Sequence, residues 1–308
     1  MRKEARLSRL QLKRIAEFSY KTMFRKAPQV SEIHETFYGW VVFLASDNAK
    51  VVVKFSREIG RLAKEVKGLD RLRQALPCPV PEVLFFGREE GYDFIMLEWL
   101  QGISAHQIPN EKHAIKRFSE SYLELLYTLH SISDPRGFEL ESERFDTSLN
   151  QAFTFWMEPV YRYVVSDGSP FTVVQKQAYR SLWERKEHIL SGASPESSLT
   201  HDDCHVGNIL VDPKSFEVTA ILDPCDVGFK HREMDIFHLF DVRPEIQLAE
   251  RYQQDVPLQP GFELRRWYFS LWDDAKHSRN MGWYDEAWTQ NKLSQFDKIV
   301  SAEYGSVI

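Results

Sequence analysis

Several features are scarce or missing in this 308-residue sequence. It has three cysteines, Cys78, Cys204 and Cys225, and none forms a Cys-x-x-Cys pair. An odd number without metal-site spacing argues against a disulfide framework and a structural zinc site, and favours a reducing compartment. No uninterrupted apolar run suits a membrane span, and the mixed charges of residues 1–6 suit neither a span nor a signal peptide. We therefore expect a cytoplasmic protein with no membrane partner.

A positive charge excess is also missing. The formal net charge is −6, and the isoelectric point is near 6.0. This balance argues against nucleic acid as a partner, although local basic patches could still bind phosphate. There is neither an internal repeat nor a low-complexity tract, and the length fits one bilobal unit or two domains. A small-molecule partner is expected, with a monomer and a homodimer both left open.

The pattern of apolar residues divides the chain into a β-rich first third and a helical remainder. Strand-forming runs lie at 36–45, 50–55, 83–87 and 92–100, and helical patterns lie at 8–26, 57–76, 111–132, 153–163, 174–190, 228–240 and 265–279. The sequence turns polar at Gln101-Gly102. We therefore predict an α+β fold with a small antiparallel nucleotide-binding lobe over residues 1–100. A larger helical lobe, with the catalytic loop and the acceptor site, is predicted over 101–308.

Two polar clusters in the second half carry the strongest chemical signal. Asp203 and Asn208 are five residues apart before the apolar run 209–211, and Asp223 ends the next apolar run, 218–222. The spacing matches the catalytic loop of protein kinases, in which an Asp accepts the proton of the attacking hydroxyl while an Asn and a later Asp hold Mg²⁺. An acid-rich turn is the ordinary alternative. Two such clusters in order, each beside a strand, favour Asp203 as the catalytic base and Asn208 and Asp223 as metal ligands.

A nucleotide site is predicted from the first lobe. Lys54 ends a strand, and Glu65 lies on the helix that follows, as in the kinase pair that fixes a lysine on the nucleotide phosphates. Glu58 is an alternative partner for Lys54. The backbone around Glu98 and Leu100, where the lobes join, could bind an adenine edge.

Other polar residues are assigned supporting or acceptor roles. His130 closes a helical pattern and is expected to be a core histidine rather than a catalytic one. Asp235 is expected to hydrogen-bond the catalytic loop. Trp272, Asp273 and Asp274 could bind a cationic acceptor, the ring by stacking and one acid by charge, because adjacent helical residues point about 100° apart. The alternative is that both acids are solvated surface charges.

The run His201-Asp202-Asp203-Cys204-His205-Val206-Gly207-Asn208 resembles the His-Gly-Asp-x-His-x-Gly-Asn motif of the aminoglycoside phosphotransferase and choline kinase superfamily. Ile221-Leu222-Asp223 is similar to its Ile-Asp-Trp metal motif. The resemblance implies a bilobal, protein-kinase-like fold, ATP or GTP with Mg²⁺, and transfer of the γ-phosphoryl group to a hydroxyl of an amino-bearing molecule such as an aminoglycoside, a fructosamine or a choline-like compound. It also implies that His201 supports the catalytic loop.

The branch within that superfamily stays open. Residues 222–224, 231–235, Tyr252 and 257–263 resemble the fructosamine kinase branch, whereas 271–274 and 284–288 resemble hygromycin phosphotransferases.

The sequence departs from the family pattern at two places. Asp202 stands where most members have Gly, and no Gly-x-Gly-x-x-Gly loop lies near residues 31–39. Both departures motivate an alternative function, a nucleotide-binding pseudokinase without transfer activity. The presence of Lys54, Asp203, Asn208 and Asp223 in one chain argues for the enzyme.

Overall fold

The computed structural model describes residues 7–36, 38–47, 49–141, 143–224 and 226–304. The N-terminal segment 1–6, Phe37 of the predicted first hairpin and Cys225 lie outside these ranges. Among the described helices, none is both long and apolar enough to cross a bilayer.

Ten α-helices are described. They are α1 (Arg9–Phe24), α2 (Arg61–Ala75), α3 (Lys112–Ser131), α4 (Leu149–Val164), α5 (Val173–Glu184), α6 (Lys186–Leu190), α7 (Glu233–Ile236), α8 (Leu248–Asp255), α9 (Phe262–Met281) and α10 (Glu286–Tyr304). Short 3₁₀ helices cover Ala105–Gln107, Val206–Asn208, Phe237–Phe240 and Pro244–Ile246.

Twelve strands are described over the same residues. They are β1 (Val30–Glu35), β2 (Gly39–Ala45), β3 (Lys50–Ser56), β4 (Val83–Glu89), β5 (Tyr92–Glu98), β6 (Ile103–Ser104), β7 (Phe138–Glu141), β8 (Arg144–Asp146), β9 (Ser198–Thr200), β10 (Ile209–Val211), β11 (Val218–Ile221) and β12 (Gly228–Lys230).

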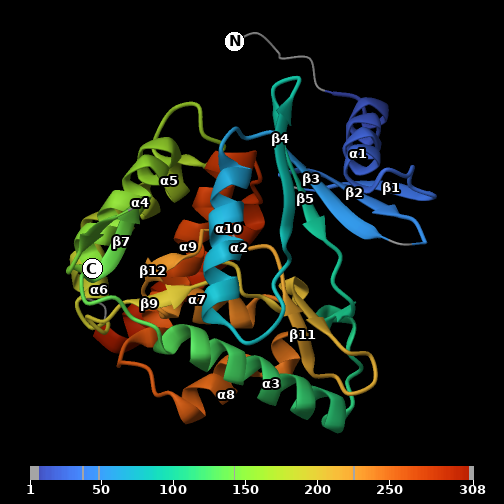
Figure 1. Ribbon diagram of the computed structural model, residues 1–308. Helices are drawn as coiled ribbons and strands as arrows, with labels where there is room; N and C mark the ends of the chain where they lie inside the picture. The colour runs from blue at the N-terminus through green and yellow to red at the C-terminus, as the bar shows by residue number, and fades with distance from the viewer. Residues whose placement is uncertain (1–6, 37, 48, 142, 225, 305–308) are drawn as a thin grey trace.

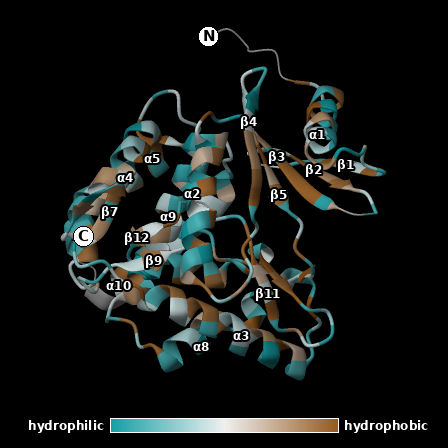
Figure 2. Ribbon diagram, in the orientation of Figure 1, coloured by the Kyte–Doolittle hydropathy of each residue, from teal (hydrophilic) through white to brown (hydrophobic). Residues whose placement is uncertain are grey.

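The first lobe is built on one antiparallel sheet with the order β1-β2-β3-β5-β4. Its central strands β2, β3 and β5 carry mainly apolar residues (Figure 2), and α1 covers one face through Leu12, Ile15 and Tyr20. Gly39 is required where β2 meets β3, because a Cβ there would lie 1.8 Å from the carbonyl oxygen of Phe55. In this sheet Lys54 pairs with Val41 on one side and with Ile95 on the other.

Helix α2 lies between the sheet and the helical part of the molecule (Figure 1). Its residues Leu69 and Leu72 belong to a buried cluster that also contains Ile95 of β5, Leu125 of α3 and Ile209 of β10. Because one apolar cluster joins both lobes, burial of this surface holds α2 against the residues around the catalytic loop.

The helical part has its own core. It is dominated by aromatic side chains from α4, α5 and α9, including Phe153, Tyr179, Tyr268 and Trp272. The predicted fold class, a small antiparallel β-rich lobe followed by a larger helical lobe, is confirmed.

Several predicted boundaries are wrong in detail. Strand β1 was not expected, because its side chains are mostly exposed at the sheet edge and lack an apolar run. The helix expected over 57–76 begins only at Arg61, after Gly60 with a φ of 87°. The helix expected over 174–190 is divided into α5 and α6, and residues 228–230 form a strand, β12, through long-range pairing with β9.

Candidate active site

The catalytic loop lies between β9 and β10 and is anchored by one buried carboxylate. Asp235 Oδ2 accepts a hydrogen bond from the His201 amide, and Oδ1 accepts one from the Asp202 amide, both at 2.8 Å. The Cys204 thiol donates to the Asp235 carbonyl at 3.0 Å. Asp235 therefore fixes the backbone immediately before Asp203, the type of contact expected from the sequence.

His130 supports this anchor from α3. Its Nε2 lies 3.0 Å from Asp235 Oδ2, and its Nδ1 lies 2.9 Å from the Tyr252 hydroxyl. Burial alone would raise the pKa of Asp235. Hydrogen bonds from the His130 ring and from the His201 amide have the opposite effect and outweigh burial, so the pKa of Asp235 lies below its ordinary value. His130 is thus a buried core histidine, as predicted.

Asp203 projects into a partly open space beside Asn208. Asn208 Nδ2 donates to the Asp203 carbonyl at 2.8 Å and to its carboxylate at 3.1 Å. His205 Nε2 lies 3.5 Å from the other carboxylate oxygen. Burial lowers the pKa of His205, against the opposing effect of Asp203, so the ring tends to be neutral. About a third of the Asp203 side chain is exposed, which leaves it open to an acceptor hydroxyl.

The two expected metal ligands are brought together by the β10–β11 hairpin. The Leu222 amide donates to the Asn208 carbonyl at 2.8 Å, and His201 Nε2 lies 3.0 Å from the Leu222 carbonyl. Asp223 follows with a φ of 53°, and half of its side chain is exposed. Carboxylate and amide oxygens suit Mg²⁺, which proteins usually hold through one or two carboxylates together with substrate phosphates. The donor set therefore fits that ion.

Lys54 lies between two carboxylates from different elements. Its Nζ is 2.7 Å from Glu65 Oε1 on α2, and it also forms an ion pair with Asp223. Glu58, the alternative partner, lies in the exposed turn before α2 and contacts the Ser56 hydroxyl through its carbonyl. Glu65 is thus the acid that positions Lys54, and Lys54 links α2 to the loop after β11.

A largely apolar cavity of about 390 Å³ opens beside Lys54. Its walls include Val52, Leu97 and Leu222, and Glu98, Trp99 and Leu100 line the side where the lobes join. The size and the apolar walls suit a flat aromatic ring, while Lys54 and Asp223 at the edge suit the phosphate end of a nucleotide.

Asp202 occupies a left-handed backbone position, with a φ of 65°. Gly adopts this conformation without steric cost and Asp tolerates it, which explains how Asp can stand where relatives have Gly. The carboxylate is almost fully buried and lies 3.1 Å from both Lys230 and Lys276. These lysines were not identified from the sequence. Asp202 in place of the Gly of the family motif was the signal in the sequence that a buried cation would be needed.

Of the acceptor residues expected on α9, Trp272 is corrected by the structure. Trp272 is fully buried among aromatic rings, so it has no free face on which an acceptor could stack. Asp273 forms ion pairs with Lys276 at 2.7 Å and His277 at 3.2 Å, and Asp274 pairs with Lys292 at 2.7 Å. Both acids are therefore internally neutralised, and neither is solvated as the alternative required.

The fold and this arrangement of charges define a bilobal, kinase-like protein. The sequence matches the phosphotransferase enzyme family over residues 30–268, and the chain belongs to that family. Among curated proteins it is similar to the uncharacterized protein YcbJ of Escherichia coli (strain K12), with 23% identity over 197 residues. That match covers 62% of this chain and 65% of YcbJ, so it spans just under two thirds of that relative.

Solved structures show the same fold at low sequence identity. A putative fructosamine-3-kinase from Haemophilus somnus 129PT superposes with a TM-score of 0.71 and 18% identity, covering 92% of this chain and 96% of that one. Aminoglycoside phosphotransferase APH(4)-Ia, in a ternary complex of a thermostable mutant with ADP and hygromycin B, gives 0.72 and 16%, covering 94% and 99%. The suspected superfamily is confirmed by the family match and by these folds.

Proposed function

We propose that this protein is a small-molecule kinase that transfers the γ-phosphoryl group of ATP or GTP to a hydroxyl group. The observation that carries the proposal is the position of Lys54, which links Glu65 to Asp223 at the edge of an apolar cavity, with Asp223 joined through the hairpin to Asn208 and Asp203. Family membership supports phosphoryl transfer as the reaction.

The residues of the loop would divide the work. Asp203 accepts the proton of the acceptor hydroxyl and orients its oxygen, while Asn208 holds the Asp203 carboxylate in place. Lys54, fixed by Glu65, neutralises nucleotide phosphate charge. Asn208 and Asp223 would hold Mg²⁺, which when bound offsets the negative charge on the phosphates. Asp235 holds the catalytic loop, and His201 joins that loop to the segment that carries Asp223. Most of the catalysis would therefore come from positioning and electrostatics.

The wall of the cavity where the lobes join would bind the nucleobase through the backbone near Glu98 and Leu100. The ADP in the APH(4)-Ia complex supports a nucleotide in this fold, and the choice between ATP and GTP is left to the assay.

An amino-bearing acceptor is supported by the family resemblance and by the relatives named as fructosamine and aminoglycoside kinases. The acids on α9 do not add to that support, because both are already paired.

A displaced catalytic base would favour the alternative function, a pseudokinase. Asp202, which precedes the proposed base Asp203, was the reason to consider it. Its carboxylate faces Lys230 and Lys276, whereas Asp203 is held by Asn208. Asp202 is thus accommodated without displacing the proposed base, and transfer activity is the better proposal.

Two assays test the function in sequence. Thermal shift with ATP or GTP, with and without Mg²⁺, should show stabilisation that needs both nucleotide and metal. A screen for nucleoside diphosphate release should then find turnover with sugar amines, choline or aminoglycosides as acceptors. Metal-dependent binding without release on any hydroxyl compound would support the pseudokinase instead.

A further inference from the structure

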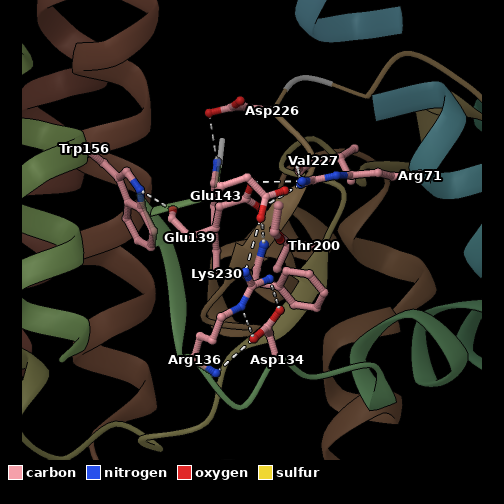
Figure 3. A network of polar contacts seen from close by, with 12 residues as sticks. Arg71, Asp134, Arg136, Glu139, Glu143, Trp156, Thr200, Asp226, Val227 and Lys230 are labelled. Carbon is pink, nitrogen blue, oxygen red and sulfur yellow. Dashed lines mark hydrogen bonds and ion pairs between the residues drawn. The ribbon is translucent and has the colours of Figure 1, made fainter. Parts of the chain in front are cut away.

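A second cavity, of about 410 Å³, lies between α2 and α4 and is lined from the far side by the segment after Asp223. We call it the α2–α4 cavity and define it by Lys64 and Lys67 of α2, Trp156 of α4, Glu139 of β7, and Asp226 and Lys230 at β12. Figure 3 shows part of its lining. We propose that this cavity binds an anionic group of the acceptor, a carboxylate or a phosphate, through Lys64 and Lys67. This inference rests on the proposed kinase function.

The acidic side chains of the cavity lining are all paired with cations, whereas not every lysine of the lining forms an ion pair. Glu139 is neutralised by Arg71 through two contacts, at 2.6 and 2.9 Å, and Asp226 lies 3.3 Å from Lys230 (Figure 3). The remaining acid of the lining, Glu141, pairs with Arg144 at 2.6 Å. Each acid therefore already has a cation within reach.

Two lysines of the lining take part in none of these ion pairs. Lys64 and Lys67 are three residues apart on α2 and so share one helix face, which borders the cavity. Within the described ranges, neither ammonium group forms an ion pair, although Lys64 lies near enough to Asp226 to help Lys230 outweigh burial and lower the pKa of that carboxyl group. An anionic ligand group between them would gain two charge-assisted contacts that the protein itself does not supply.

The opposite wall is aromatic. Phe155 and Trp156 line it, and Trp156 is held by a hydrogen bond from its Nε1 to the Glu139 carbonyl at 2.9 Å. A ring fixed in this way offers a flat apolar surface opposite the lysines. The cavity thus suits a small ring or sugar that carries an acidic group.

The cavity also adjoins the catalytic loop. Lys230 lines it and lies 3.1 Å from Asp202, the residue before Asp203. Asp223 borders the first cavity and Asp226, three residues later, borders this one. An acceptor anchored by its anionic group would therefore lie on the Lys230 side of the catalytic loop, one residue away from Asp203, with Asp223 between it and the proposed nucleotide.

Binding of matched sugars to the whole chain tests the proposal. Glucose, glucose 6-phosphate, gluconate, glucosamine and glucosamine 6-phosphate would each be titrated calorimetrically, with ADP and Mg²⁺ saturating the first cavity. The protein variants are the double substitution Lys64→Gln/Lys67→Gln and, as a control, Lys298→Gln, which removes an exposed lysine of α10 outside the cavity. Thermal melting confirms that each variant is folded.

We expect at least one acidic sugar to bind about tenfold or more tightly than its uncharged or amino parent, equal to about 1.4 kcal/mol. The double variant should lose that preference and the control should keep it. Gluconate and the phosphates distinguish a carboxylate site from a phosphate site. Equal binding of parents and acidic sugars, a preference that survives the double substitution, or no binding of any acidic sugar at about 10 mM would overturn the proposal. Failure of ADP to bind would instead count against the kinase function, and the sugar titrations without nucleotide would still decide the lysines' role.

Discussion

The two sides of the catalytic loop differ in how their charges are held. On one side Lys54 meets Glu65 and Asp223, and half of the Asp223 side chain is exposed. On the other side Lys230 and Asp202 are almost completely buried and face each other. Lys54 and Glu65 are largely buried, so only the half-exposed Asp223 is free to change partners when a charged ligand arrives. The Asp202–Lys230 pair is buried on both sides and is fixed by the cost of leaving a charge unpaired. We propose that the first side binds metal and phosphate, and that the second holds the loop beside the α2–α4 cavity.

The largest effect is expected at Asp203, where the two sides meet. Asp203→Asn should lower kcat by about 10²–10⁴, because the amide cannot accept the hydroxyl proton. Nucleotide affinity should stay unchanged, since Asp203 contacts Asn208 and not the cavity around Lys54. Steady-state kinetics and calorimetry with ATP and Mg²⁺ measure both. If the variant turned over like the wild type, Asp203 would not be the general base.

A pH effect is expected from His238, which is buried near Asp203, Asp241 and Asp273. Burial lowers its pKa, but Asp241, Asp273 and Asp203 outweigh this and raise it from 6.5 to about 9. A raised pKa in the folded state contributes stability that is complete below about pH 6.5 and is lost as pH rises through about 9. The contribution is up to about 3 kcal/mol.

Chemical denaturation of the wild type and of His238→Gln from pH 6 to 9.5 checks this expectation. The free energy of unfolding of the wild type should fall more steeply over that range than that of the variant. Parallel curves would show that His238 is not held protonated by these acids.

A smaller loss of stability is expected from Asp202→Asn. The substitution removes a carboxylate from two buried lysines, but Lys230 keeps Asp226 and Lys276 keeps Asp273. We expect the free energy of unfolding to fall by about 2 kcal/mol, within the range for a buried polar group that loses its partner. Asp70→Asn, which breaks an exposed pair with Arg73, is the matched control and should change it by less than about 0.5 kcal/mol. Equal effects of the two substitutions would mean that the Asp202 side is not fixed by burial.

The smallest expected effect is on kcat/KM for ATP, and it distinguishes Glu65 from Glu58 as the partner of Lys54. Glu65→Ala should lower kcat/KM for ATP by about tenfold, or about 1.4 kcal/mol, by leaving Lys54 without its anchor on α2. Glu58→Ala should leave it near the wild-type value, because that side chain is exposed in the turn before α2. The reverse pattern of kinetic constants would assign the lysine to Glu58.

The same division explains what could be predicted from the sequence. Asp203 and Asn208 were predicted from their five-residue spacing, and Lys54 and Asp223 from their places at strand ends; the structure brings the four residues together around one hairpin. Local apolar patterns also predicted the sheet and most helices.

The rest depends on long-range packing. Strand β12 exists because it pairs with β9, and Lys230 faces Asp202 only as a result of that pairing. The burial of Trp272 depends on rings from α4 and α5 that are about a hundred residues away in sequence. No spacing within α9 distinguishes such a core tryptophan from one that faces a ligand, so Trp272 was misassigned.

Calorimetric titration of ATP with and without Mg²⁺ shows on which side of the catalytic loop the metal binds, using the wild type, Asp223→Ala and Lys64→Gln/Lys67→Gln. We predict that Mg²⁺ strengthens ATP binding to the wild type and to the lysine variant, and that this gain disappears in Asp223→Ala, because Asp223 is the proposed carboxylate ligand of the metal. Equal metal dependence in all three proteins, or its loss in the lysine variant alone, would contradict the assignment of the two sides of the loop.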